Sequence, residues 1–124
     1  MSIIRKNIEQ LGLPAGPYTH AVIHSQTLYT SGFTAFGTPA QTGSAHAQTR
    51  AVLNQLETLA LEFGRSLEDL IKVTVFVTDP TDIPQIRDAL SQAYGDAVPA
   101  SSLLLISALF APGLKIEIEA IFAV

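Results

Sequence analysis

Apolar residues recur along the middle of the chain at spacings that predict a long helix. Between Ser44 and Phe63 they are spaced by four, three and four residues, which is typical of one helix face. Ser44 is a suitable N-cap, because its hydroxyl can accept a hydrogen bond from a free N–H of the first turn. Gly64 is a suitable residue just beyond the C-terminal end. The predicted apolar face consists of Val52, Leu56, Leu59 and Phe63.

A second helix is predicted in the following third of the chain. Thr81 or Asp82 is the expected N-cap, and Pro84 fits the first turn, where a missing N–H costs little. Gly95 ends the pattern. The predicted apolar stripe consists of Ile83, Ile86, Leu90 and Tyr94.

Alternation of side-chain types predicts strands on either side of this helix and near the N-terminus. The strand before the helix alternates valines with other residues and is rich in β-branched side chains, as strands are. The strand after it is apolar on both faces, whereas the last strand is apolar on one face and begins with charged residues on the other. The first two strands form an expected hairpin. The predicted strands are 21–25, 28–31, 71–78, 101–110 and 115–124.

This order of elements predicts an α+β fold with a mixed sheet in a single domain, residues 1–124. Two helices cannot cover both faces of a sheet of this size, so they are expected to cover one. The other face is partly apolar, and its least costly cover is a neighbouring copy of the chain. The chain is therefore expected to form a homo-oligomer.

Composition agrees with burial between copies and argues against several classes of function. The chain is 48% hydrophobic and only 15% charged, against roughly 25% charged in average chains. Its net charge is −4 with no basic cluster, which argues against nucleic acid as a partner. No apolar run reaches the length of about 18 residues that a membrane span needs, and the N-terminus lacks a signal-peptide pattern. A cytoplasmic protein without a membrane partner is expected.

No metal or other cofactor is expected from the sequence. The absence of cysteine excludes disulfides and thiolate metal sites. His20 and His24 have the spacing to share one face of a strand, but no third ligand accompanies them. Zinc sites usually need three or four protein ligands.

Five segments resemble the Rid family of small proteins (RidA- or YjgF-like), and they occur in that family's order across nearly the whole chain. They are Gly16–Ala21, Tyr29–Gly32, Ile71–Asp79, Tyr94–Ala100 and Lys115–Ala120. The resemblance implies a chorismate-mutase-like fold of the bacillus type and a homotrimer with three clefts, each lined by two subunits. It also implies hydrolysis of reactive enamines or imines, with release of ammonia and a keto acid, and no cofactor. The implied partners are a small molecule in each cleft and other copies of the chain.

The resemblance also implies the residues of the cleft. Glu119 matches the glutamate that positions or activates the attacking water, and Tyr18 matches a residue that meets the ligand. Glu119 has a structural alternative, an ion pair with Lys115 or Lys72, and Tyr94 fits the apolar stripe of its helix equally well. The other residues expected at the cleft are Ser31, Gly32, Phe33, Tyr94, Ser101 and Leu103.

One residue of the family pattern is missing, the arginine that binds the substrate carboxylate. In the family it follows Pro-Ala, whereas here Pro99-Ala100 is followed by Ser101. The segment from Ser101 to Lys115 is one residue longer than in active members, and moving the alignment by one residue places Ser102 at that position. Phe33 and Leu103 stand where the family often has glutamine and a small residue. The pocket is therefore expected to be poorly suited to the usual 2-iminoacids.

Three functions are compatible with these observations. The first is an imine or enamine hydrolase, resembling a deaminase, with an altered substrate. The second is a ligand-binding or regulatory trimer that keeps the cleft and has lost the chemistry. The third is ribonuclease activity or inhibition of translation, which the acidic charge and the lack of a catalytic His–Lys–Arg cluster make the weakest of the three.

Overall fold

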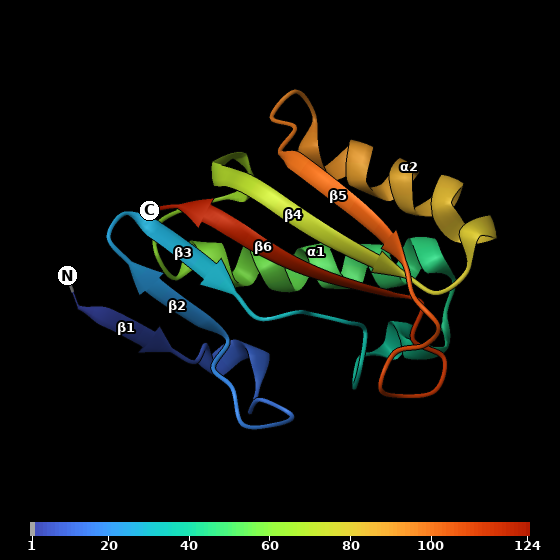
Figure 1. Ribbon diagram of the computed structural model, residues 1–124, viewed down its shortest axis with the longest axis horizontal. Coiled ribbons are helices and arrows are strands. Elements are labelled where there is room, and N and C mark those ends of the chain that lie inside the picture. The colour runs from blue at the N-terminus through green and yellow to red at the C-terminus, as the bar shows by residue number, and fades with distance from the viewer. Residues whose placement is uncertain (1) are drawn as a thin grey trace.

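Six strands form one mixed sheet, and both long helices lie on the same face of it in the computed structural model, which describes residues 2–124 (Figure 1). The strands occur in the order β1-β2-β3-β6-β4-β5, in which only β4 and β5 are parallel neighbours. The expected α+β fold with two helices on one face is therefore confirmed. The elements are β1 (Ile3–Lys6), β2 (Ala21–His24), β3 (Thr27–Thr30), α1 (Ala45–Leu61), β4 (Leu70–Val77), α2 (Ile83–Tyr94), β5 (Ala100–Leu105) and β6 (Ile116–Ala123).

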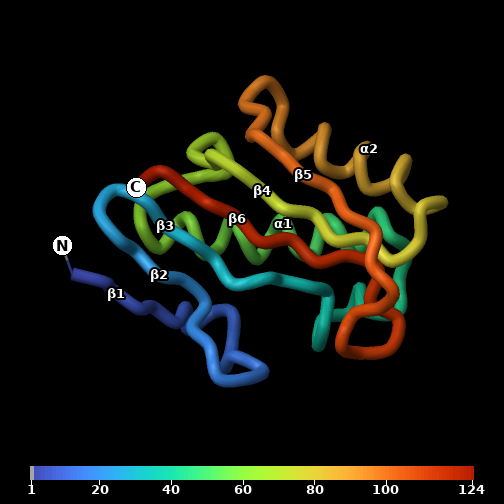
Figure 2. The backbone as a smooth tube through the Cα atoms, viewed as in Figure 1, coloured from blue at the N-terminus to red at the C-terminus, as the bar shows by residue number. Residues whose placement is uncertain are grey.

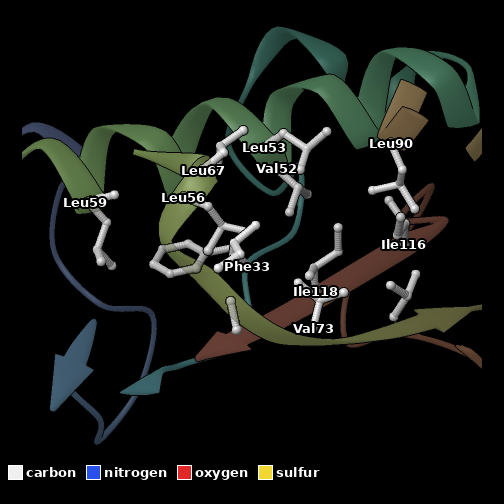
Figure 3. Close-up of a cluster of buried hydrophobic side chains, with 14 of the residues drawn as sticks. Phe33, Val52, Leu53, Leu56, Leu59, Leu67, Val73, Leu90, Ile116 and Ile118 are labelled. Carbon is white, nitrogen blue, oxygen red and sulfur yellow. The ribbon is translucent and has the colours of Figure 1, made fainter. Parts of the chain in front are cut away.

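The core lies between the helices and the sheet. Helix α1 crosses behind the central strands, and its buried face packs on side chains from β4 and β6 (Figure 3). Val52, Leu56 and Leu59 are fully buried, as the spacing predicts, and Phe63 is partly buried. Ile86 and Leu90 of α2 are buried as well, with Ile83 and Tyr94 packed against the same cluster. None of the helices within residues 2–124 has the length and apolar character needed to cross a membrane.

The ends of α1 follow the predicted signals, whereas the start of α2 does not. The Ser44 hydroxyl accepts a hydrogen bond from the N–H of Ala47 at 3.1 Å. Gly64 has a φ of +68°, the left-handed conformation that favours glycine. Before α2, however, Asp79 rather than Thr81 or Asp82 provides the capping oxygen, because a 3₁₀ turn over Pro80–Asp82 precedes the α-helix.

Two strand predictions need correction. The predicted strand 101–110 ends at Leu105, since Ile106 makes the last backbone bond to β4 and residues 106–114 then form a loop. Strand β1 was not expected at all. Its four residues are all exposed, so it has no buried face to leave a pattern in the sequence. Pairing with β2 alone makes it the edge of the sheet (Figure 2).

The strand register assigns each side chain to the helix-covered face or to the opposite face, called here the open face. Glu119 of β6, Thr74 of β4 and Ser102 of β5 form one row of the open face. The next row consists of Glu117, Phe76 and Leu104. On the helix-covered face, Ser101 is paired with Val73 and Leu103 with Val75, and both valines are fully buried.

The open face predicts self-association. Large apolar side chains on it remain substantially exposed, including Tyr29 at 46% and Leu104 at 43%. A patch of this kind on a small chain is expected to be covered by another subunit.

We expect size-exclusion chromatography with light scattering to give about three times 13.2 kDa. Leu104→Glu should lower this mass toward 13.2 kDa, because it places a charge in the apolar contact. Leu61→Glu is the matched control, since Leu61 is 65% exposed on α1 in the helix layer. A wild-type monomer at micromolar concentration would refute the trimer.

Candidate functional site

A pocket of about 300 Å³ lies where the first loop, the end of β3 and the start of β6 meet. Its residues come from three parts of the chain, 15–18, 31–32 and 110–117, and the fold brings them together. The pocket is lined by Ala15, Tyr18, Ser31, Gly32, Phe110 and Glu117. It therefore contains three residues expected from the sequence, Tyr18, Ser31 and Gly32. It also contains Glu117, which the sequence offers only as a second carboxylate on the face of Glu119, and Phe110, which was not expected.

Glu117 reaches the pocket because Gly32 has no side chain. A Cβ atom built on Gly32 would lie 2.5 Å from Glu117 Oε2 and 2.7 Å from its Cδ. This close approach follows from pairing of Phe33 with Ile118, whose N–H groups donate to each other's carbonyl oxygens at 2.9 and 3.0 Å. Gly32 and Glu117 each precede one member of this antiparallel pair, so they lie diagonally across it. The glycine therefore leaves free the space that the Glu117 carboxylate occupies.

The Glu117 carboxylate lacks a positive partner. In residues 2–124 the only ion pair joins His46 and Asp88, which are elsewhere in the helix layer. Burial is the main cause that raises the pKa of the Glu117 carboxyl, and the negative charge of Glu119 on the same face raises it further. A carboxyl group with these properties can exchange protons nearer to neutral pH than an exposed one.

Hydrogen bonds hold the neighbouring polar groups in place. The Ser31 hydroxyl donates to the Thr19 carbonyl, which leaves its oxygen as an acceptor toward the pocket. The Tyr18 hydroxyl accepts from the N–H of Ala15 at 3.2 Å and retains its own proton for a ligand. The Gly32 N–H has no acceptor among the described residues. One acceptor and two donors are therefore available beside the carboxylate.

Phe110 forms an aromatic wall of the pocket together with Phe36. The two ring centroids are 5.0 Å apart with an interplanar angle of 57°, an ordinary tilted aromatic contact. Phe110 is nevertheless 63% exposed and Phe36 48% exposed. About half of Phe36 and more than half of Phe110 thus remain free to contact another molecule.

Gln48 holds the loop that carries Phe110. It is fully buried, and its side-chain N–H groups donate to the carbonyls of Gln41 (3.0 Å), Gly43 (3.3 Å) and Gly113 (2.8 Å). Its side-chain oxygen accepts the N–H of Lys115 at 2.9 Å. The Gln48 side chain therefore connects two loops to the core, the loop that carries Phe36 and the end of the loop that carries Phe110.

A second cleft of about 570 Å³ adjoins the pocket on the open face. Tyr18 and Ser31 line both cavities, so a ligand in one could extend into the other. Arg5 of β1 lines the far part of the second cleft, together with Val22 and Tyr29 of β2 and β3. The charged groups of the combined cavity are therefore Glu117 at one end and Arg5 at the other.

The remaining sequence-predicted site residues lie outside this pocket. Glu119 is exposed on the open face and is not among the lining residues, and it forms no ion pair with Lys115 or Lys72 in the described chain. Ser101 and Leu103 are on the helix-covered face, because each pairs with a buried valine of β4. The residues that the register places on the open face are Ser102 and Leu104.

Phe33 and Tyr94 are core residues rather than pocket residues. Phe33 is 7% exposed within the core cluster and lines only a small adjoining cavity of about 90 Å³. Its ring also contacts the buried His20 ring, at 5.8 Å between centroids. Tyr94 packs against the core at the end of α2, where its hydroxyl has no hydrogen-bond partner and burial raises its pKa to about 12.

His20 supports the first loop. It is 3% exposed, and its ring Nδ1 accepts a hydrogen bond from the backbone N–H of Ile8 at 2.9 Å. The backbone N–H of His20 donates to the side-chain oxygen of Asn7 at 3.0 Å. Burial lowers the pKa of the His20 ring, so the neutral form is favoured. These contacts fix the chain just after Tyr18, which places the tyrosine at the pocket.

Comparison with known proteins places this chain among a set of similar sequences and structures. A family model described as Endoribonuclease L-PSP matches residues 9–124. The 2-iminobutanoate/2-iminopropanoate deaminase of Bos taurus is 32% identical over 126 residues, covering 97% of this chain and 90% of that protein. The mitochondrial protein mmf1 of Schizosaccharomyces pombe is 33% identical over 111 residues, covering 86% and 68%. The crystal structure of a protein of the conserved Rid family from Yersinia pestis superposes with a TM-score of 0.89 at 26% identity, covering 99% of this chain and all of that one.

The raised pKa of Glu117 predicts a pH-dependent effect of Glu117→Gln on stability. Folding favours the protonated carboxyl, so its contribution is fully present below the unfolded-state value of 4.5 and is lost as pH rises through the raised pKa. Glutamine is neutral at every pH. Thermal unfolding should therefore give similar melting temperatures for the two proteins at low pH and a higher one for the variant near neutral pH. A difference that does not change with pH would contradict the assignment of a half-buried, unpaired carboxylate.

Proposed function

The chain belongs to the endoribonuclease L-PSP family, and from this premise we propose that it hydrolyses a small imine or enamine that lacks the carboxylate of the usual 2-iminoacids. A relative with 32% identity is named for the deamination of such iminoacids. The observation that supports the proposal is the isolated Glu117 carboxylate, held over Gly32 beside Tyr18 and Ser31. Glu117 takes the role for which the sequence suggested Glu119.

The geometry suits acid–base catalysis with one water molecule. Glu117 accepts a proton from water while the water oxygen bonds to the imine carbon and the C=N electron pair moves to nitrogen. The carboxyl returns that proton to nitrogen, giving a carbinolamine. The carboxylate then moves the hydroxyl proton to nitrogen, the C–N bond breaks, and ammonia leaves with a carbonyl product. The Tyr18 hydroxyl and the Gly32 N–H are the donors available to orient the substrate and its developing oxygen.

The substrate is altered because nothing in the pocket can grip a carboxylate with two charge-assisted hydrogen bonds. Such a bond contributes roughly 1.5–3 kcal/mol, and an arginine makes two in parallel. Ser102, which lies on the open face, offers only one neutral hydroxyl. The expected loss is on the order of 3 kcal/mol, about a hundredfold in affinity.

Charge also argues against RNA as the substrate. Affinity for nucleic acid depends mainly on neutralising phosphates, whereas the chain has 7 basic residues against 11 acidic ones. The only charged side chain lining the pocket is Glu117.

Replacement of the pocket glutamate should abolish most turnover. Glu117→Gln keeps the shape of the side chain and removes the ionisable group, so hydrolysis should fall about a hundredfold or more, the usual scale of acid–base contributions. Ammonia release from an imine substrate is the measurement. Glu119→Gln is the discriminating variant, because Glu119 shares the face and the charge but does not line the pocket. A large loss at Glu119 with none at Glu117 would return the role to Glu119.

Restoring an arginine should restore affinity for small carboxylates only at the position that faces the open side. Ser102→Arg should tighten binding of 2-ketobutyrate, and Ser101→Arg should not, because Ser101 belongs to the helix-covered face. Calorimetric titration measures both. The wild type should hydrolyse iminoacids from an amino-acid oxidase about a hundredfold more slowly than an arginine-bearing relative. Comparable rates would show that another group holds the carboxylate and would remove the case for an altered substrate.

A further inference from the structure

The pocket combines a single negative charge with exposed aromatic surface. Glu117 is the only charged residue among its six lining residues, and it has no positive partner within the described chain. Phe110 presents a ring that is 63% exposed, and Tyr18 presents one that is 44% exposed. Both rings line the same pocket as the carboxylate.

We propose that this site selects a cationic ligand with an apolar substituent, namely the protonated imine of an arylalkyl or alkyl primary amine. This inference rests on the proposed function and names its substrate class. The positive iminium nitrogen pairs with Glu117, and the apolar substituent lies against Phe110. The substrate has no carboxylate, in keeping with the absence of a basic residue in the pocket.

Two kinds of group at this pocket stabilise a cation away from water, a carboxylate and an aromatic face. A carboxylate that is half-buried and unpaired gains a counter-ion when a cation binds, which reverses part of its desolvation cost. An aromatic face attracts a cation by about 0.5–2 kcal/mol. An anionic ligand would instead be repelled by Glu117 and would find no compensating charge among the lining residues.

The loop that supplies Phe110, residues 106–114, is held at both of its ends. The N–H of Ile106 donates to the carbonyl of Val77 at its start, and Gln48 bonds to Gly113 and Lys115 at its end. Phe36 supports the ring from the loop that precedes α1, at 5.0 Å between centroids. The aromatic wall is therefore a built part of the site rather than an exposed side chain on a free loop.

Other cations on the same face lie outside the pocket. Lys72 donates a hydrogen bond to the Ser102 hydroxyl at 3.0 Å, and it lies on β4 four residues before Phe76, the strand partner of Glu117. Arg5 lines the adjoining cleft and not the pocket itself. If either cation reached the ligand, from the same copy or a neighbouring one, the site would prefer an anion. Whether the site prefers a cationic or an anionic ligand therefore shows whether a basic side chain reaches it.

The ligand class also defines the preceding reaction. A protonated primary imine arises when an amine loses two electrons and two protons to the oxidant of an amine oxidase or dehydrogenase. Addition of water then yields an aldehyde and ammonium, with no further redox change. The chain would therefore act on the product of primary-amine oxidation.

The test uses calorimetric titration of the full chain with benzylammonium and benzoate, which have similar size and opposite charge, at about pH 8, where both are ionised. Benzylammonium should bind at least about tenfold more tightly. Phe110→Ala should weaken its binding by roughly two- to tenfold, the range that corresponds to the loss of one aromatic pair contact with the benzyl ring. Glu117→Gln should remove most of the preference for the cation.

Two control variants match the test variants. Leu61→Ala removes an apolar side chain of similar exposure, 65%, from the helix layer, and Glu57→Gln removes an exposed carboxylate of α1. Neither should change the affinity for benzylammonium. Equal or tighter binding of benzoate, no binding of benzylammonium, or an unchanged affinity in Phe110→Ala would each overturn the proposal.

A second measurement separates this inference from the proposed function. Benzaldimine is generated from benzylamine by an amine oxidase, and its hydrolysis to benzaldehyde is followed by ammonia release with and without the protein. Selective, Phe110-dependent binding without faster hydrolysis would support the ligand class and refute the imine hydrolase. Faster hydrolysis of another imine, dependent on Glu117 but without preference for the cation in titration, would support the hydrolase and refute the ligand class.

Discussion

Strand β6 lies between β3 and β4, and its alternate side chains go to opposite faces of the sheet. Ile116, Ile118 and Phe122 are fully buried beneath the helices, so the burial that stabilises the core fixes which residues face the other way. A shift of one residue would expose these apolar side chains and bury Glu117 and Glu119. The position of the pocket carboxylate is therefore a consequence of the same register that forms the core.

That carboxylate is held in an environment that disfavours its charge. Gly32 provides the space, Glu119 adds a like charge, and no basic residue of the described chain offsets either. Such an arrangement lowers the stability of the folded chain at neutral pH. It also raises the pKa of the carboxyl, as in groups that transfer protons. The surrounding parts are rigid, since the Phe33–Ile118 pairing, His20 and Gln48 each fix one side of the pocket with hydrogen bonds to the backbone.

The groups that line the pocket are not of the kind that binds a carboxylate. The register places Ser102 and Leu104 on the open face, and the loop after β5 adds Phe110 beside the glutamate. Apolar and aromatic surface thus surrounds one negative charge at this pocket. The proposed change of substrate charge is in keeping with these features taken together.

The sequence by itself determined the elements with strong local signals and the family. Helix α1, its Ser44 cap and the apolar faces of both helices follow from short-range periodicity, and the five family-like segments predicted the fold and placed Tyr18, Ser31 and Gly32 at the site. Only the tertiary structure decided between Glu117 and Glu119, and between Ser101 and Ser102. The members of each pair are only one or two residues apart on a strand. Which member lies at the pocket or on the open face depends on the pairing of that strand with its neighbours. Strand β1 and the position of Phe110 also became evident only in the tertiary structure. An exposed edge strand and a loop make their contacts with residues distant in the chain, and local sequence patterns carry no information on such contacts.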